Sequence, residues 1–189
     1  MKVNLGAGSD IRPGWINHDL VKLQGIDVTH DLNIMPWPWP DSSLDEIHAM
    51  DVLEHLEDFM LAMAEIWRVL KPRGILLLSV PYMNSVSAVG DPTHRRSFHE
   101  TTFYFFDPTK SQCQNRFYYT HARFLIEQEE FVIAPFHPYF IIPGLSMRRV
   151  RRRWSRLIVG LIGNYFITNL ILDLHMRMQK ISPVLEESR

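Results

Sequence analysis

At 189 residues the chain is about one domain long, which is enough to bury a hydrophobic core. Its formal net charge of −1 gives no overall attraction to nucleic acid, so we expect no nucleic-acid partner. The single cysteine, Cys113, excludes an internal disulfide bond and fits a reducing compartment. Because a strand pattern begins directly after Met1, we expect no signal peptide and a cytoplasmic location.

The first predicted strand, residues 3–5, runs directly into two glycines, Gly6 and Gly8. Glycine lets the backbone turn sharply and approach a ligand closely, as the first strand-to-helix turn of nucleotide-binding α/β folds requires. The dinucleotide pattern G-x-G-x-x-G needs a third glycine, and this chain has Ile11 there. An ordinary glycine-rich turn is therefore an open alternative at this point.

Three more short strands are predicted along the next part of the chain, over residues 15–19, 26–32 and 44–50. A proline-rich and tryptophan-rich loop, residues 36–43, precedes the last of them. Only residues 6–14 and 20–25 separate the first three strands, whereas a full parallel crossover needs about a dozen residues or more. We therefore expect the first two crossovers to be shortened and one edge of the sheet to be thinly covered.

A helix is predicted after the fourth strand, with Asp58 as its N-cap. Its apolar residues recur at helical spacing and predict a stripe that packs in the core: Met60, Met63, Ala64, Trp67 and Leu70. Lys71-Pro72-Arg73-Gly74 should end the helix, with Gly74 reversing the chain direction. The apolar run over residues 75–80 is typical of a central parallel strand buried on both faces.

Residues 3 to about 80 resemble the class I S-adenosylmethionine-dependent methyltransferases, of the compact kind called methyltransferase type 11. The segments PDSSLDEI, VLEHL and EIWRVLKP-x-G, then an apolar strand, occur in that family's order. The resemblance implies an α/β fold with a Rossmann-like sheet, mostly parallel with an antiparallel last strand. It also implies one methyltransferase domain over residues 1–189, with a cofactor-binding half (1–80) and a substrate-side half (81–189) that carries a helical insertion and the last strands.

The cofactor implied by the resemblance is S-adenosylmethionine. Gly6 and Gly8 would pass beside its methionine part, where backbone amides meet the carboxylate. Asp19 matches the acidic residue on the ribose hydroxyls, Asp31 and Leu32 match the segment around the adenine, and Asp51 would lie near the sulfonium. The complete implied set is Asn4, Leu5, Gly6, Ala7, Gly8, Asp19, Asp31, Leu32 and Asp51.

The pattern Asp51-x-x-Glu54-His55 is similar to a divalent-metal set found in some methyltransferases of catechol-like or RNA substrates. Hard cations favour such oxygen-rich sites. The Glu-His pair also occurs in members without metal, as a structural part of the helix start. We favour that interpretation and expect no metal.

The substrate side begins after Pro81, where residues 91–99 combine a carboxylate, two imidazoles and two guanidinium groups. Methyl transfer is an in-line displacement, so the enzyme aligns the nucleophile and, for a hydroxyl, removes its proton. We expect His94 to be that base and Asp91 to orient it, although a turn with a satisfied histidine is the alternative. Arg95 and Arg96 would grip an anionic acceptor or be solvated.

The aromatic residues Phe98, Phe103, Tyr104, Phe105 and Phe106 are predicted to roof the pocket, with most of them packed in the core. The extended pattern over residues 119–133 and the strict alternation over 172–179 predict the antiparallel pair that ends the sheet.

Between them, residues 148–156 carry six arginines, and residues 157–172 are mostly apolar. This stretch is too short and interrupted for a bilayer span, which needs about 20 apolar residues. We expect a helix packed on its own domain and against a second copy in a homodimer, in preference to contact with a membrane surface.

The resulting hypothesis is S-adenosylmethionine-dependent methyl transfer to oxygen or nitrogen of a small-molecule or sugar-type acceptor. A nicotinamide-dependent oxidoreductase shares the glycine turn but does not predict the later motifs. A non-catalytic cofactor-binding scaffold would keep Gly6, Gly8 and Asp19 and need nothing from the His94 segment.

Overall fold

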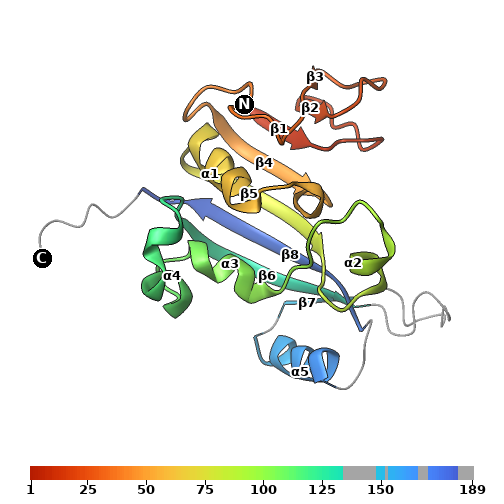
Figure 1. The fold of residues 1–189 in the computed structure, drawn as a ribbon, viewed down its shortest axis with the longest axis vertical. Helices are drawn as coiled ribbons and strands as arrows, with labels where there is room; N and C mark the ends of the chain where they lie inside the picture. The colour runs from red at the N-terminus through yellow and green to blue at the C-terminus, as the bar shows by residue number, and fades with distance from the viewer. Residues whose placement is uncertain (134–147, 152, 166–169, 183–189) are drawn as a thin grey trace, which may run out of the picture.

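The computed structural model describes residues 1–133, 148–151, 153–165 and 170–182. Their framework is an eight-stranded sheet in the order β3-β2-β1-β4-β5-β8-β6-β7 (Figure 1). The strands are β1 (Lys2–Leu5), β2 (Ile16–Asp19), β3 (Val28–Thr29), β4 (Leu44–Met50), β5 (Leu70–Pro81), β6 (Phe124–Ile133), β7 (Arg148–Val150) and β8 (Ile171–Lys180). The helices are α1 (Phe59–Val69), α2 (Val86–Gly90), α3 (Glu100–Phe103), α4 (Ser111–Asn115) and α5 (Arg153–Tyr165), with short 3-10 turns at Leu53–His55, Tyr104–Phe106 and Phe117–Tyr119.

The sheet confirms the fold class expected from the sequence. Strands β1 to β5 pair in parallel, and β8 inserts antiparallel between β5 and β6. The chain leaves β1 toward β2 and β3 on one side, and β4 and β5 lie on the other side of β1. This reversal of strand order opens a crevice at the carboxyl ends of the parallel strands, where open α/β sheets bind their ligands.

The first two crossovers are short, as the residue spacing predicts. No helix forms within residues 6–15 or 20–27, all of which the structure describes. Strand β3 is limited to two residues and is shorter than the predicted 26–32 strand. The reason is a turn: the Ile34 amide donates to the Asp31 carbonyl at 2.9 Å, and the Asn33 amide donates to the Asp31 carboxylate.

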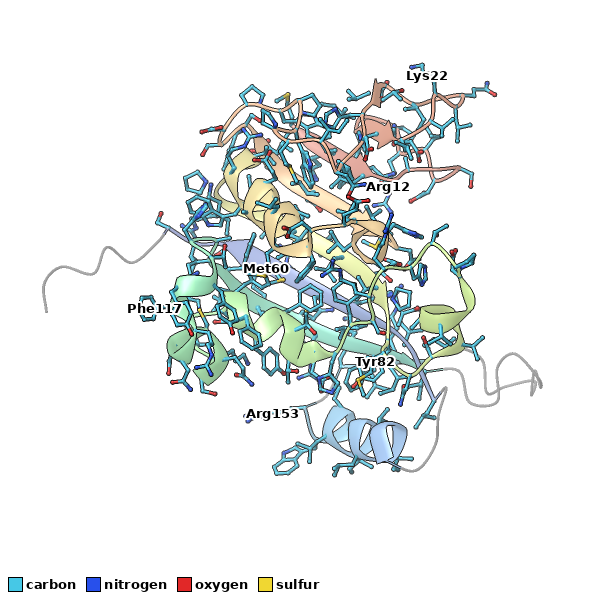
Figure 2. All side chains as sticks on the ribbon, viewed as in Figure 1. Arg12, Lys22, Met60, Tyr82, Phe117 and Arg153 are labelled. Carbon is cyan, nitrogen blue, oxygen red and sulfur yellow. The ribbon has the colours of Figure 1, made fainter. Side chains whose placement is uncertain are left out.

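Helix α1 begins as predicted, with the Asp58 carboxylate accepting from the Leu61 amide at 2.9 Å. The predicted apolar stripe does lie against the core, but the most buried face is rotated from it: Phe59, Ala62, Met63, Ile66 and Val69 are buried. Met60, labelled in Figure 2, and Trp67 are only partly buried against that core. The rotation follows from the contacts of Phe59 with the aromatic cluster described below.

The segment after α1 corrects one expectation. Helix α1 ends at Val69, and β5 starts at once, so Lys71 to Gly74 are already part of an irregular strand. The residue with positive φ is Arg73, at +65°, and not Gly74. Gly74 is needed for space, because a Cβ there would lie 2.9 Å from the Lys71 carbonyl oxygen.

Three of the five aromatic residues predicted to roof the pocket belong to the core instead. Phe98, Phe103 and Phe106 are fully buried, and their rings pack edge-on or stacked around Phe59 at centroid distances of 5.1 to 5.7 Å. Residues that fill the space between α1 and the sheet cannot also face a ligand. The prediction of a roof was wrong for these three, while the prediction of core packing was right.

The arginine-rich segment begins as a strand and continues as a helix. Residues 148–150 pair antiparallel with β6 as an added edge strand, where the sequence predicted helix. Helix α5 then follows and lies at the edge of the body (Figure 1). Arg152 and residues 166–169 of the predicted segment lie outside the described residues. Within the described residues, no helix combines the length and apolar character that a membrane crossing requires.

Candidate functional site

A cavity of about 850 Å³ opens at the carboxyl ends of the parallel strands. Its wall comes from the turn after β1, the ends of β2 and β3, the segment after β4 and the loop before α3. The lining residues are Gly6, His18, Asp19, Leu20, His30, Asp31, Leu32, Asn33, Asp51, Val52, His55, Leu56, Pro92, Thr93, His94 and Arg95. The cavity therefore joins the two halves that the sequence analysis assigned to cofactor and substrate.

The glycine turn after β1 has the strained geometry that only glycine adopts without cost. Gly6 and Gly8 have φ angles of +58° and +50°. A Cβ at Gly6 would lie 2.5 Å from Val52 Cγ2, whereas nothing lies within 4 Å of a Cβ built at Gly8. Gly6 is thus required for close packing against the segment after β4, and the space beside Gly8 is open.

Asp19 ends β2 at the cavity wall, where the sequence placed the ribose-binding carboxylate. Its Oδ2 accepts a hydrogen bond from the Gly8 amide at 2.8 Å, and its Oδ1 accepts from the Val21 amide at 3.1 Å. An ionised carboxylate has about four lone-pair sites, so each oxygen keeps capacity for another donor. The two amides hold the carboxylate in position and leave a lone pair on each oxygen for a ligand.

Asp31, Leu32 and Asp51 also line the cavity. The Asp31 carboxylate is held by the Asn33 amide at 2.9 Å, and Asp51 Oδ1 accepts from Ser79 Oγ at 3.2 Å. Asp51 has a φ of +54°, which is unusual for a residue with a side chain. Three aspartates in one wall favour a ligand that carries positive charge.

Four of the expected cofactor residues do not line this cavity. Asn4 and Leu5 are buried in β1, and the Asn4 amide group donates to the Asp10 carbonyl at 2.7 Å. The Ala7 amide donates to the His18 carbonyl at 2.8 Å, and the Gly8 amide is taken by Asp19. These residues shape the turn, and a direct contact of theirs with a cofactor stays a prediction.

His94 and Asp91, the expected base and its orienting residue, lie together. His94 Nε2 is 4.0 Å from Asp91 Oδ2 and also 4.0 Å from Glu54 Oε1. Asp91 is exposed and bonded to Thr93 through both the amide and the hydroxyl, which lowers the pKa of its carboxyl group. His94 lines the cavity, whereas Asp91 does not.

Glu54 is a buried acid that the sequence analysis placed only in the metal-binding alternative. The residue is fully buried, and among the described residues neither carboxylate oxygen has a hydrogen-bond partner. Burial raises the pKa of Glu54 to about 8, and the charges of Asp51, Asp173 and Asp91 add to the effect. Its burial could have been inferred from its place between apolar residues in the segment VLEHL.

The two arginines after His94 have different surroundings. Arg95 lines the cavity, its amide donates to the Glu54 carbonyl at 2.8 Å, and its guanidinium pairs with Glu57. The Arg96 guanidinium donates to the Glu57 carbonyl at 2.6 Å and lies over the Phe59 ring, so Arg96 has a structural role. Among the lining residues, His18 and His30 belong to none of the motifs that the sequence analysis singled out.

Comparison with known proteins shows that part of the chain is similar to methyltransferases. Residues 6–78 match the model of a methyltransferase domain. A probable S-adenosylmethionine-dependent methyltransferase from Mycolicibacterium smegmatis is 33% identical over 92 residues, which cover 49% of this chain and 35% of that protein. This chain therefore spans about a third of the length of that relative.

Residues 6–78 are therefore similar to the methyltransferase domain of class I S-adenosylmethionine-dependent methyltransferases. The methyltransferase fold extends beyond the matched region. The YcgJ protein of Bacillus subtilis covers 96% of this chain and 91% of its own at a TM-score of 0.58 and 15% identity. An S-adenosylmethionine-dependent methyltransferase of Archaeoglobus fulgidus covers 95% and 85% at a TM-score of 0.58 and 19% identity.

The relatives from Mycolicibacterium smegmatis and Archaeoglobus fulgidus are both named as dependent on S-adenosylmethionine. The cavity fits such a cationic cofactor in two respects. The strained turn at Gly6 and the open space at Gly8 let the backbone come close to a ligand. The carboxylates of Asp19, Asp31 and Asp51 then provide acceptors for hydroxyl and amino groups and negative potential for a sulfonium.

Proposed function

We propose that the chain transfers a methyl group from S-adenosylmethionine to an oxygen or nitrogen of a small-molecule or sugar-type acceptor. One observation carries the proposal. The glycine turn and the three aspartates share a single cavity with His94, so a cofactor site and a candidate base open into the same space. The match of residues 6–78 to a methyltransferase domain supports the same assignment.

The cofactor half of the cavity is assigned to Asp19, Asp31, Leu32 and Asp51. Asp19 would accept from the two ribose hydroxyls, because its carboxylate is held at the end of β2 by the Gly8 and Val21 amides. Asp31 would accept from an exocyclic amine while Leu32 packs against the ring. The bound cofactor supplies an electrophilic methyl group on a sulfonium.

The acceptor half is assigned to the loop that carries His94. The His94 ring is largely buried, with 9% of its side chain exposed, and it reaches the cavity wall. A neutral imidazole there can take the proton of an acceptor hydroxyl or ammonium group as the methyl group is transferred. Asp91, 4.0 Å from Nε2, would stabilise the imidazolium that results.

The test is a transfer assay with S-adenosylmethionine carrying a labelled methyl group and a panel of hydroxyl and amine acceptors, sugars included. We expect label to appear in at least one acceptor and the cofactor product to accumulate in step with it. A protein that binds the cofactor but transfers label to none of the panel would support the scaffold alternative. Hydride transfer from a nicotinamide cofactor would support the oxidoreductase alternative.

We also propose that the chain forms a homodimer through α5. Five of its apolar side chains are exposed at spacings of three and four residues, and Trp154 is 78% exposed: Trp154, Leu157, Ile158, Leu161 and Ile162. A contiguous apolar face of this kind is usually covered. Light scattering in detergent-free buffer should report a dimer that Leu157→Glu dissociates. A monomer that sediments with anionic vesicles would instead support a membrane surface as partner.

A cytoplasmic location stays a prediction from the sequence.

A further inference from the structure

We propose that Glu54, His55 and His94 form a binding site for a divalent transition-metal cation, with Zn²⁺ as the best match. The sequence analysis favoured a metal-free site and considered only Asp51, Glu54 and His55 as ligands. The structure replaces Asp51 with His94, which comes from the loop between α2 and α3. The new set is two imidazoles that line the cavity and the buried carboxyl group of Glu54 beside them.

The three side chains are close enough to share one ion. One ligand atom from each residue lies within 4.8 Å of the other two, and His94 Nε2 is 4.0 Å from Glu54 Oε1. In a tetrahedral zinc site with bonds of about 2.0–2.1 Å, neighbouring ligand atoms stand roughly 3.4 Å apart. The set therefore needs to contract by about an ångström, which small side-chain rotations provide.

The hydrogen bonds of the two imidazoles engage Nδ1 of each ring and leave Nε2 as the possible ligand atom. His94 Nδ1 lies 3.3 Å from the Ala88 carbonyl oxygen, which can only accept, so Nδ1 carries the proton. The Thr93 hydroxyl donates to Asp91 Oδ1 at 2.6 Å and therefore accepts from His55 Nδ1 at 3.0 Å. Both rings then carry a lone pair on Nε2. Metal-binding histidines commonly donate their second ring N–H to a backbone carbonyl or to a group bonded to a carboxylate, and this bond fixes the orientation of the ring.

The surroundings of Glu54 give a second, independent argument for a bound cation. Its side chain is 1% exposed, and within the described part of the chain both its oxygens lack a hydrogen-bond donor. The nearest polar group in the set, His94 Nε2, is an acceptor in the tautomer that Ala88 selects. A buried carboxyl group opposite two imidazole lone pairs is stabilised by a positive charge placed between them, which a bound cation would supply. The charges of Asp51 and Asp91 nearby make the surroundings of Glu54 still more negative.

The ligand set selects the class of metal. Two nitrogens and one oxygen suit Zn²⁺ and its transition-metal neighbours, whereas Mg²⁺ and Ca²⁺ prefer oxygen ligands alone. Three protein ligands leave a position open, and two of the three residues line the cavity. At the open position the cation would bind the oxygen or nitrogen of the methyl acceptor. Only this last step of the inference rests on the proposed function. The two proposals give His94 Nε2 different roles: it is the proton acceptor in the cation-free chain, as proposed above, and a ligand in the cation-bound chain.

The test measures cation uptake by the full chain after treatment with a chelator and dialysis. Equilibrium dialysis with Zn²⁺ should give one tightly bound equivalent, and Co²⁺ should give the visible absorption of a tetrahedral site. Glu54→Gln, which keeps the shape of the side chain, and His94→Ala should each weaken Zn²⁺ binding by more than about a hundredfold, because even outer-shell partners are worth 10- to 100-fold. Mg²⁺ at the same concentration should not compete.

Two matched variants keep the test specific. Glu57→Gln changes an exposed carboxylate three residues away, and His121→Ala removes an exposed imidazole that packs on Trp67. Neither should alter Zn²⁺ uptake. Absence of saturable uptake by the folded wild-type chain, or uptake that survives Glu54→Gln, overturns the proposal. Cation uptake requires no S-adenosylmethionine, so failure of the proposed function, seen as absence of cofactor binding, is a separate outcome.

Discussion

The Gly8 amide donates a hydrogen bond to the Asp19 carboxylate at 2.8 Å, and this bond joins the turn after β1 to the end of β2. Two residues that the sequence analysis assigned separately to the cofactor are therefore one unit. The glycine conformation aims the amide, and the amide holds the carboxylate at the cavity wall. A change at either residue should affect the other, which allows their roles to be tested together.

Asp19→Ala should weaken binding of S-adenosylhomocysteine. A charged acceptor of hydrogen bonds contributes about 1.5–3 kcal/mol, which corresponds to roughly a tenfold to hundredfold loss of affinity. Calorimetric titration measures the effect. Asp41→Ala, an exposed carboxylate paired with Arg68 outside the cavity, is the control and should bind normally. Unchanged affinity in a folded Asp19→Ala protein would remove Asp19 from the site.

Gly6→Ala should destabilise the fold more than Gly8→Ala. Both substitutions force a non-glycine residue into the left-handed region, at a cost of about 1–2 kcal/mol. Only Gly6→Ala also places a Cβ 2.5 Å from Val52 Cγ2, and overpacking adds about 1–3 kcal/mol. Urea denaturation of the two variants gives the comparison. Equal losses would show that Val52 moves aside without cost.

His94→Ala should lower turnover by about a hundredfold to ten-thousandfold while affinity for S-adenosylhomocysteine stays unchanged. The reason is that His94 faces the acceptor side of the cavity and is not assigned to the cofactor. Steady-state kinetics with the acceptor found by labelled transfer, paired with calorimetry, separates the two effects. Near-normal turnover at neutral pH would mean that positioning of the acceptor suffices.

Asp173 should make the free energy of unfolding fall between about pH 4 and pH 6. Burial and the charge of Asp51 raise the pKa of Asp173 from 3.8 to about 6 in the folded chain. As pH rises, the unfolded chain therefore loses this proton first, and unfolding becomes more favourable until the folded group also ionises. At about 1.4 kcal/mol per pH unit, the loss is at most about 3 kcal/mol.

Urea denaturation of wild-type and Asp173→Asn proteins from pH 4 to pH 7 isolates this contribution as the difference between the two curves. The variant should gain relative stability as pH rises through that window. Asp51→Asn should reduce the same difference, because it removes the second cause of the shift. Parallel curves over the whole range would contradict the assignment.

The periodic parts of the fold were predictable from the sequence. The strand over 44–50 and the cap at Asp58 follow from residue type and spacing alone, and the structure has both. Edge strand β7 was not predictable, because a run of arginines has no strand pattern and pairs only because β6 offers a free edge. The positive φ of Arg73 could not be predicted either, because the next residue is Gly74 and glycine is the usual residue in that conformation.

The site divides in the same way. Gly6, Asp19, Asp31 and Asp51 follow strands in sequence, so their meeting at one sheet edge could be predicted from the topology. The approach of His94 to Glu54 and His55 could not, because it depends on how the loop after β5 folds back over the segment after β4. The resemblance to a divalent-metal set of other methyltransferases therefore suggested Asp51 as the third partner of the Glu-His pair.

Binding of the cofactor product tests the central claim most directly. Calorimetric titration of the full chain with S-adenosylhomocysteine, and separately with NADH, needs no knowledge of the acceptor. A methyltransferase site built on Gly6, Asp19 and Asp31 predicts saturable binding of one S-adenosylhomocysteine per chain and no binding of NADH. Tight binding of NADH without binding of S-adenosylhomocysteine would contradict the account.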